Sequence, residues 1–431
     1  METKENTRKI RKRNMRLFPI YKMLSWDLLF YYTINFLFLI QIKNISASDI
    51  VLIESFQALF VIILQIPINI MITFIGRKKS LVLGNISLVI YIMIIIFSRN
   101  IYDLILANFI KGIGVTLKGT VESSFLKESI PPTKYKSQIF SKLNSKGATG
   151  YYIMNMISKI VAGYLFTING YLPMTFTLII LIITTVMAIS FKEPIENVDL
   201  DSRKNKKVDE FSNIKVGFKF IMKSERVKAL IIAGSFIYAC LTILGDYEIN
   251  LLKDINLSAI TIGYAGATSS LVSALASKNE NKFNKMFKNK SLTILSLLLS
   301  ISAIIMGSCG NLNISKSIVG ILIILSMYML LGFVMGMYYT IIDRYLMNFT
   351  NKEIDTKVKG VYNLFRNIFK CIYGFLASFI LGITTSSYAL IIVGIIFTIV
   401  FILVNIYMKP RVGLEPEQYS KEERKYDELK N

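Results

Sequence analysis

The chain is divided at residues 192–227 by the hydrophilic segment KEPIENVDLDSRKNKKVDEFSNIKVGFKFIMKSERV. On either side of it the sequence consists largely of long apolar runs, and 53% of the 431 residues are hydrophobic. A run of about twenty apolar residues predicts a transmembrane helix. Six such runs precede the segment and six follow it. The sequence therefore predicts an all-α integral membrane protein with twelve transmembrane helices in two pseudo-symmetric six-helix bundles.

The predicted spans have approximate boundaries. They are residues 22–42, 48–74, 80–98, 101–125, 138–167, 171–191, 226–250, 258–278, 291–310, 316–345, 357–382 and 386–408. The first run follows the basic segment RKIRKRNMR, as the apolar part of a signal peptide would. Because it continues for about twenty residues without a small-residue cleavage site, we predict a first helix that is retained.

Five parts of the chain follow from these spans. They are a basic cytoplasmic amino terminus (1–21), an N-terminal six-helix bundle (22–191), a cytoplasmic linker (192–225), a C-terminal six-helix bundle (226–408) and a charged cytoplasmic tail (409–431). The stretch IKVGFKFIMKSERV, which closes the linker, mixes lysines with apolar residues in the way of an amphipathic helix at a membrane surface.

The net charge of +22 is distributed as in a membrane protein. Lys and Arg gather in alternate connecting segments, while the segments between them are short and hold few basic residues. This positive-inside pattern argues against nucleic acid as a partner. It predicts a multi-pass membrane protein with both termini in the cytoplasm. The leading hypothesis places it in a bacterial plasma membrane.

The chemistry open to the chain is limited by what it lacks. It has no histidine, and its three cysteines (Cys240, Cys309 and Cys371) are scattered and odd in number. The sequence thus predicts no disulfide framework, no metal site and no cofactor. It offers no nucleotide-binding loop and no nucleophile motif, so we do not expect an enzyme. Any proton handling must depend on carboxylates, helped by Lys or Tyr.

The two halves repeat each other. KNISASDI at 43–50 resembles INLSAITI at 255–262, and each holds a serine placed to cap the following helix. RKKSL at 77–81 matches KNKSL at 288–292, and both begin the third span of their half. Because the two pairs are separated by nearly the same length of chain, the sequence predicts an internal duplication.

Two six-helix halves, a basic turn between spans two and three and a long central loop resemble the major facilitator superfamily over nearly the whole chain. The superfamily's loop signature is Gly-x-x-x-Asp-Arg-x-Gly-Arg-Lys, and the corresponding stretch here is NIMITFIGRKK, 69–79. Gly76, Arg77 and Lys78 match it, whereas Thr73 stands at the Asp position. In the family this Asp belongs to a charge relay that holds the cytoplasmic side closed.

Spans four and five carry further parts of the resemblance. NFIKGIG keeps Gly112 and Gly114 of the pattern Arg-x-x-x-Gly-x-Gly, with Asn108 at the Arg position. SKIVAG keeps Gly163 of the Gly-Pro…Gly-Gly motif of proton-coupled drug exporters, with Lys159 at the Pro position. The resemblance implies a secondary transporter that works by alternating access, is a monomer and is similar to bacterial drug-efflux antiporters.

Ionisable residues within spans mark candidate functional groups, because a charge at bilayer depth is costly. In span four, Lys118 and Glu122 lie about 20° to either side of Lys111 around the helix. We expect Lys111 to contact solute or a counter-charge. Lys118 and Glu122 either neutralise each other as an i,i+4 pair or form part of an inner gate. Spans three, six, nine and twelve are essentially free of ionisable residues, so we predict that these four are peripheral.

Other spans carry comparable groups. The predicted cavity residues are Lys111, Lys159, Arg366, Lys370, Asn35, Tyr31, Tyr152 and Tyr373. The predicted proton-coupling or gating residues are Asp27, Glu54, Lys118, Glu122 and Asp246. We expect Glu248 to be solvated near the outer end of span seven. The small residues of GFVMG, 332–336, are interpreted as a helix-packing motif.

The leading hypothesis is a transporter for proton-coupled efflux of a small amphipathic compound or drug. The alternative is an anionic or zwitterionic solute, or a lipid, passing through a basic cavity that contains Lys111, Lys159, Arg366 and Lys370. A non-transporting membrane sensor or scaffold is the alternative from another class. The expected partners are therefore a small-molecule solute, H⁺ and the lipid bilayer.

Overall fold

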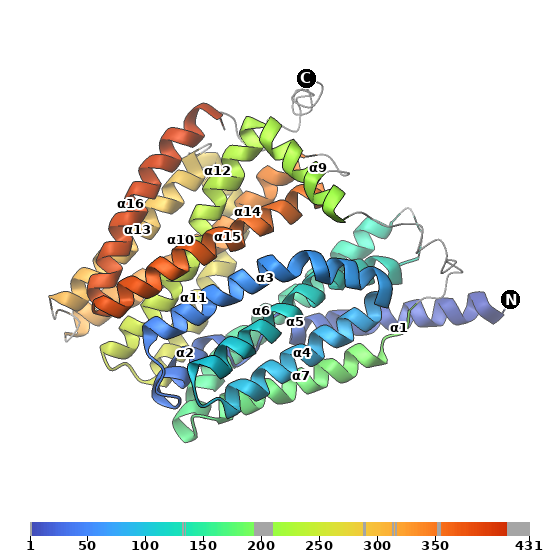
Figure 1. Ribbon diagram of the computed structural model, residues 1–431, viewed down its shortest axis with the longest axis horizontal. Helices are drawn as coiled ribbons and strands as arrows, with labels where there is room; N and C mark the ends of the chain where they lie inside the picture. Colours follow the sequence, from blue (N-terminus) through green and yellow to red (C-terminus); the bar gives the residue numbers. More distant parts are fainter. Residues whose placement is uncertain are drawn as a thin grey trace. The chain divides into compact units, whose positions relative to one another are not determined.

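The computed structural model consists of α-helices (Figure 1). It describes residues 2–411 except 132, 134, 194–209, 288–289, 313, 315–316 and 351–354. In chain order the helices are α1 (Glu2–Ser25), α2 (Tyr32–Gln41), α3 (Ala47–Ile75), α4 (Arg77–Phe97), α5 (Ile101–Ser129), α6 (Lys136–Ile168), α7 (Leu172–Ser190), α9 (Glu210–Lys223), α10 (Glu225–Asp254), α11 (Ala259–Lys278), α12 (Glu280–Phe287), α13 (Ser291–Asn311), α14 (Ile318–Phe349), α15 (Asp355–Ile383) and α16 (Ser386–Arg411). The predicted all-α fold is confirmed for the described residues.

Within this part of the chain, ten helices are long and apolar enough to cross a membrane. They are α3, α4, α5, α7, α10, α11, α13, α14, α15 and α16. The two other predicted spans, 22–42 and 138–167, correspond to α1 with α2 and to α6. The α6 helix carries Lys142, Lys146 and Lys159, which make it more polar than the ten.

The first predicted span is broken. The α1 helix ends at Ser25, and α2 begins only at Tyr32. Between them Phe30 has a φ of 64°, a left-handed conformation that is costly for an L-residue with a side chain. Asp27 Oδ1 accepts a hydrogen bond from the backbone nitrogen of Leu28 at 2.9 Å. The prediction of one continuous helix over 22–42 is therefore wrong.

The duplicated serines begin helices as predicted. Ser46 Oγ accepts a hydrogen bond from the backbone nitrogen of Asp49 at the start of α3. Ser258 Oγ accepts one from the backbone nitrogen of Thr261 at the start of α11. Each bond satisfies an N–H group that the first turn of a helix leaves unpaired. Both capping predictions are confirmed, while the duplication itself stays a prediction.

The helices form two compact units. The first comprises Met1–Ile45 and Phe60–Glu210, and the second comprises Ser46–Leu59 and Phe211–Asn431. The α3 helix thus begins in the second unit and continues in the first. Residues 194–209 of the predicted linker, and the tail after Arg411, lie outside the described residues. The five-part organisation drawn from the sequence stays a prediction.

In the first unit, α4 packs against α5 and α7, and α1 packs against α6. The α4–α5 approach is close because Gly84 and Gly114 face each other. A Cβ added to Gly114 would lie 2.9 Å from the backbone oxygen of Gly84. Small residues permit such approaches between membrane helices. Gly114 of the span-four motif therefore serves packing in this chain.

In the second unit, α13 packs against α14 and α16, and α10 packs against α15 and α16. The α11 helix packs against α14, where Gly332 and Gly336 leave no room for a Cβ beside the backbone of Ser269 and Ser273. The interpretation of GFVMG as a packing motif is confirmed.

The variant Gly114→Ala should destabilise the first unit, because its Cβ would meet the backbone of α4. We expect a loss of about 1–3 kcal/mol, measured as a lower thermal midpoint of the purified protein. Gly119→Ala is the matched control in α5, since a Cβ there has nothing within 4 Å. The control should keep or raise the midpoint because Ala favours a helix. Equal midpoints for the two variants would contradict the close approach.

Candidate functional site

Lys111, in α5 of the first unit, is buried among tyrosine rings. The residue is 4% exposed. Its ammonium nitrogen lies 5.2 Å from the ring centre of Tyr91, 5.5 Å from that of Tyr31 and 5.8 Å from that of Tyr32. All three distances fall within the range of about 6 Å over which a ring attracts a cation. We call Lys111 with these three tyrosines the Lys111 cage.

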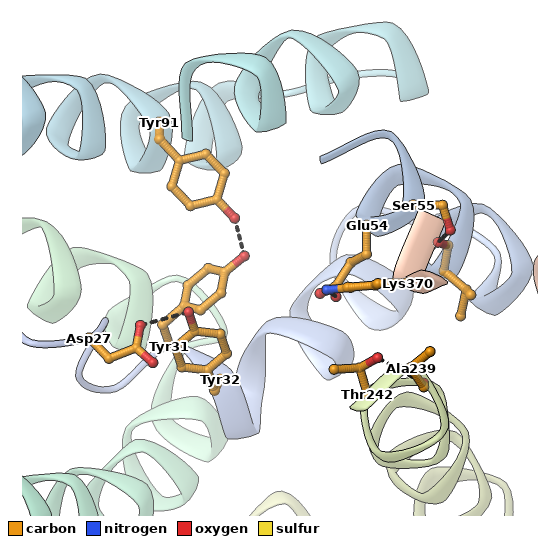
Figure 2. Close-up of polar contacts among 10 residues, drawn as sticks. Asp27, Tyr31, Tyr32, Glu54, Ser55, Tyr91, Ala239, Thr242 and Lys370 are labelled. Carbon is orange, nitrogen blue, oxygen red and sulfur yellow. Dashed lines mark hydrogen bonds and ion pairs between the residues drawn. The ribbon is translucent and has the colours of Figure 1, made fainter. Parts of the chain in front are cut away.

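Tyrosine hydroxyls form one hydrogen bond within the cage and one to Asp27 outside it (Figure 2). The hydroxyls of Tyr31 and Tyr91 are hydrogen-bonded to each other, and the Tyr32 hydroxyl donates to Asp27 Oδ1 at 2.7 Å. Tyr31 is the last residue of the break between α1 and α2 and Tyr32 is the first residue of α2, so the start of α2 decides where they lie. Asp27, which lies in the break, is thus hydrogen-bonded to Tyr32 of the cage. Lys111 itself forms no ion pair with any described residue.

Asp27 also faces basic residues of two other helices. It is accessible, and it interacts electrostatically with Lys118 of α5 and Lys159 of α6. The neighbouring Trp26 packs edge-on against Tyr152 of α6, with ring centres 5.4 Å apart. The structure therefore brings together, within the first unit, the predicted groups of spans one, four and five.

The predicted ion pair between Lys118 and Glu122 is not formed in the described structure. Both residues are buried, but Lys118 Nζ lies 6.0 Å from the ring centre of Tyr21, and Glu122 Oε1 has no hydrogen-bond partner. Glu122 interacts electrostatically with both Lys118 and Lys22 without bonding to either. An i,i+4 spacing permits contact between two side chains but does not impose it. Here the ammonium group of Lys118 lies over the ring of Tyr21 in α1 instead.

In the second unit, Lys370 of α15 forms an ion pair with Glu54 of α3 (Figure 2). Lys370 Nζ lies 3.2 Å from Glu54 Oε2, and both side chains are mostly buried. Asp246 of α10 also interacts electrostatically with Lys370. The acidic groups around Lys370 thus come from other helices, as the sequence pattern predicts.

Arg366, one turn before Lys370, is surrounded by tyrosines of α10, α14 and α15. The guanidinium carbon lies 3.8 Å from the ring centre of Tyr238, 5.5 Å from that of Tyr339 and 5.6 Å from that of Tyr362. Its Nη1 donates a weak hydrogen bond to Asn363 Oδ1 at 3.3 Å. We call Arg366 with these three tyrosines the Arg366 cage. Each unit thus holds one cation among three tyrosine rings.

Two other predicted cavity residues lie apart from the cages. Tyr373 packs against Phe236 and Phe369, with ring centres 5.4 Å and 6.2 Å away. Asn35 of α2 is buried, and its Oδ1 has no hydrogen-bond partner. Their assignment to the solute cavity stays a prediction.

The loop motif between α3 and α4 is held by acids at the same end of the first unit. Gly76 has a φ of 84°, which favours glycine. Arg77 forms an ion pair with Glu128 at the end of α5, and the backbone nitrogen of Lys78 donates to Glu193 Oε1 at 3.1 Å. Glu128 and Glu193 therefore supply negative charge to a motif that has Thr at the family's Asp position.

The expectation of a solvated Glu248 is wrong. This residue of α10 is 0% exposed, and neither carboxylate oxygen has a hydrogen-bond partner. The α10 helix continues to Asp254, one turn beyond the predicted end of span seven, so Glu248 lies within its packed length. The hydroxyl of Tyr328 in α14 is near enough to interact with it electrostatically.

The tyrosines of the cages are the functional candidates that the pattern of charges does not reveal. Tyr91 lies in α4, which the lack of ionisable residues marks as peripheral, yet it contributes to the Lys111 cage. Tyr238 and Tyr339 lie in apolar runs without a polar stripe of their own. The one signal in the sequence would have been a tyrosine on the helical face that points toward a cation without an acidic partner.

Comparison with protein families gives a match to the Major Facilitator Superfamily over residues 23–374. The chain belongs to this superfamily. Membership makes it a multi-pass membrane protein and a secondary transporter, in agreement with the apolar helices and the resemblance of the loop motif. A comparison with curated proteins found no match.

The fold is similar to those of several solved transporters. The nucleoside transporter NupG aligns with a TM-score of 0.67 at 11% identity, covering 93% of this chain and 99% of that one. A POT family transporter in complex with 5-aminolevulinic acid gives 0.70 at 13% identity, over 93% and 96% of the two chains. A D-xylose-proton symporter gives 0.62 at 13% identity, over 92% and 96%. At these identities the likeness concerns the fold, and the predicted superfamily fold is confirmed.

Removing both partners of the ion pair should cost less than the two single removals added together. Glu54→Gln leaves the Lys370 charge without its nearest acid, and Lys370→Gln leaves that of Glu54. We expect each single variant to lower the thermal midpoint, and the double variant to lower it by less than the two losses together. The coupling should be about 0.5–3 kcal/mol. Additive losses would show that the pair contributes nothing to stability.

Proposed function

We propose that this secondary transporter carries a small solute with an anionic group, either an anion or a zwitterion. The observation that carries the proposal is the pair of cages: Lys111 and Arg366 are each surrounded by tyrosine rings and form no ion pair with described residues. Lys111 is buried and Arg366 is partly buried. A cation that is withheld from water without a counter-charge is costly, and rings offset only part of that cost. An anionic group of the solute supplies the missing charge.

The cages also suit the recognition of such a group. Arg366 presents a planar set of N–H donors, which matches a carboxylate or phosphate bidentately, and its Nε has no hydrogen-bond partner. Because a transporter of this family alternates between two conformations, the solute has to be bound in one and released in the other. A cation that is partly stabilised by rings retains that stability when the solute leaves.

The test is solute flux in proteoliposomes with a panel of anionic, zwitterionic, neutral and cationic compounds. Lys111→Met and Arg366→Met should abolish at least about 90% of the flux of an anionic substrate, because the positive charge is lost while an unbranched apolar side chain remains. Lys282→Gln is the control, since Lys282 lies exposed in α12. Flux of cations alone, undiminished in both variants, would overturn the proposal.

A second candidate is proton-coupled efflux of amphipathic compounds, and unpaired carboxyl groups favour it. Glu122 has one oxygen and Glu248 two oxygens without hydrogen-bond partners, so both are placed to exchange protons when their surroundings change. Asp27 is accessible beside the exposed rings of Trp26 and Tyr152, which offer apolar contact for such a compound. This candidate and the first share one scaffold and differ in solute and coupling ion.

Proton coupling is tested by the collapse of a preformed pH gradient in inverted vesicles. If a lipophilic cation collapses it, Glu248→Gln, Glu122→Gln or Asp27→Asn should suppress that response, with solute binding retained in at least one variant. Glu225→Gln is the control, because its side chain is 57% exposed. A response unchanged in all three variants would contradict a role for these acids. No solute-dependent flux in either assay would favour a sensor or scaffold.

The cellular setting belongs to the same proposal. We infer a bacterial plasma membrane, both termini in the cytoplasm and a monomeric transporter. The alternation of basic and non-basic connecting segments supports the orientation.

A further inference from the structure

The α9 helix packs with one face on the second unit. Gly217, Phe220 and Ile221 are buried there. A Cβ on Gly217 would lie 2.7 Å from the backbone oxygen of Lys357, so α9 approaches the first turns of α15 closely. This face of α9 is therefore covered by the same chain, with the start of α15 against Gly217.

The remaining surface of α9 carries two exposed stripes. Lys215, Lys219 and Lys223 recur every four residues, which places them within about 80° of one another around the helix. Phe218 and Met222 form an apolar stripe beside them and are 45% and 51% exposed. A helix with adjacent basic and apolar exposed stripes fits a surface that is apolar on one side and negatively charged on the other.

The neighbours of α9 place it at the edge of the membrane. The α10 helix, which is long and apolar enough to cross a membrane, begins at Glu225, two residues after α9 ends, and α15, which is also long and apolar enough, begins at Asp355. The ring of Phe218 is stacked with that of Phe365 in α15, at 6.5 Å between centres. The α9 helix thus precedes one candidate span directly and packs on the first turns of another, which favours a position at the boundary of the membrane.

We propose that α9 is a binding surface for anionic phospholipid headgroups of the bilayer. The three lysines face the phosphates, while Phe218 and Met222 enter the boundary between headgroups and acyl chains. Charge complementarity decides the class of lipid, because the exposed stripe is basic and contains no acid.

Lipid at this surface acts on the transporter through α15. That helix carries both Arg366 and Lys370, and α9 packs on its first turns. An anionic lipid that holds α9 in place therefore restrains the end of the helix that bears the Arg366 cage. We expect anionic lipid to change the rate of transport without changing which solutes are carried.

The binding test uses the purified full-length protein in mixed micelles of phosphatidylcholine and phosphatidylglycerol, with retained lipid counted by native mass spectrometry. The triple variant Lys215→Gln/Lys219→Gln/Lys223→Gln should reduce the preference for phosphatidylglycerol by about tenfold or more. The matched control is Lys278→Gln/Lys282→Gln/Lys285→Gln, which removes the same charge from exposed positions of α11 and α12. The control should keep the preference.

A second variant, Met222→Ser, removes an apolar side chain and leaves all charges. It should weaken retention of both lipids while keeping the preference for phosphatidylglycerol. An undiminished preference in the triple variant, or an equal loss in the matched control, would overturn the proposal, because the lysines of α9 would then have no specific role.

The effect on transport is measured in vesicles of phosphatidylcholine alone and with roughly one third phosphatidylglycerol. Wild type and the matched control should respond to the anionic lipid, and the triple variant should not. The lipid count does not depend on any solute, so a wrong assignment of the solute would leave the binding result standing. An equal response of flux in all three proteins would overturn the effect through α15.

Discussion

A positive charge inside a membrane protein must be surrounded by groups that lipid does not provide. In this chain the faces of tyrosine rings meet that need for Lys111 in one unit and for Arg366 in the other. Much of the local architecture follows from it. The start of α2 places two rings, α4 sends a third toward α5, and α10, α14 and α15 each contribute one around Arg366. Because rings surround both cations, neither forms an ion pair with a carboxylate of the described residues.

Lys370 and Arg366 show how one helix face can serve two purposes. Lys370 is held by the nearby charges of Glu54 and Asp246, which join α15 to α3 and α10. Arg366 has rings and a weak hydrogen bond in place of a carboxylate. An acid-bound cation loses much of its attraction for an anionic solute, whereas a ring-bound cation keeps it. Neighbouring positions of α15 thus differ, since an ion pair holds Lys370 whereas Arg366 lies among rings without an acid of the described residues.

Most of the helices follow from the sequence because the membrane imposes a length and an apolar composition on each span. Ser46 and Ser258 begin their helices as predicted because capping depends on local geometry. The break before α2 could not be predicted in this way, since Phe30 adopts a left-handed conformation without Gly, Asn or Pro to signal it. Tertiary packing outweighs the local preference there.

In the candidate site, too, some features could be predicted from the sequence and others depend on tertiary packing. The cations and acids of the spans could be named because their cost at bilayer depth singles them out, whereas their partners depend on packing between helices. Lys118 lies over Tyr21 instead of pairing with Glu122, although the spacing along α5 allows the pair. Glu248 shows the sensitivity to boundaries, because one further turn of α10 changes an exposed end into a buried position.

The break between α1 and α2 has a mechanical consequence. A continuous helix resists bending because tilting one end stretches its ladder of backbone hydrogen bonds, but an interrupted helix has no such ladder at the interruption. The 10 residues of α2 can therefore change their inclination as a short rigid lever while α1 stays in place. Since Tyr31 and Tyr32 sit at the pivot of that lever, a small rotation of α2 loosens two of the three rings around Lys111 at once.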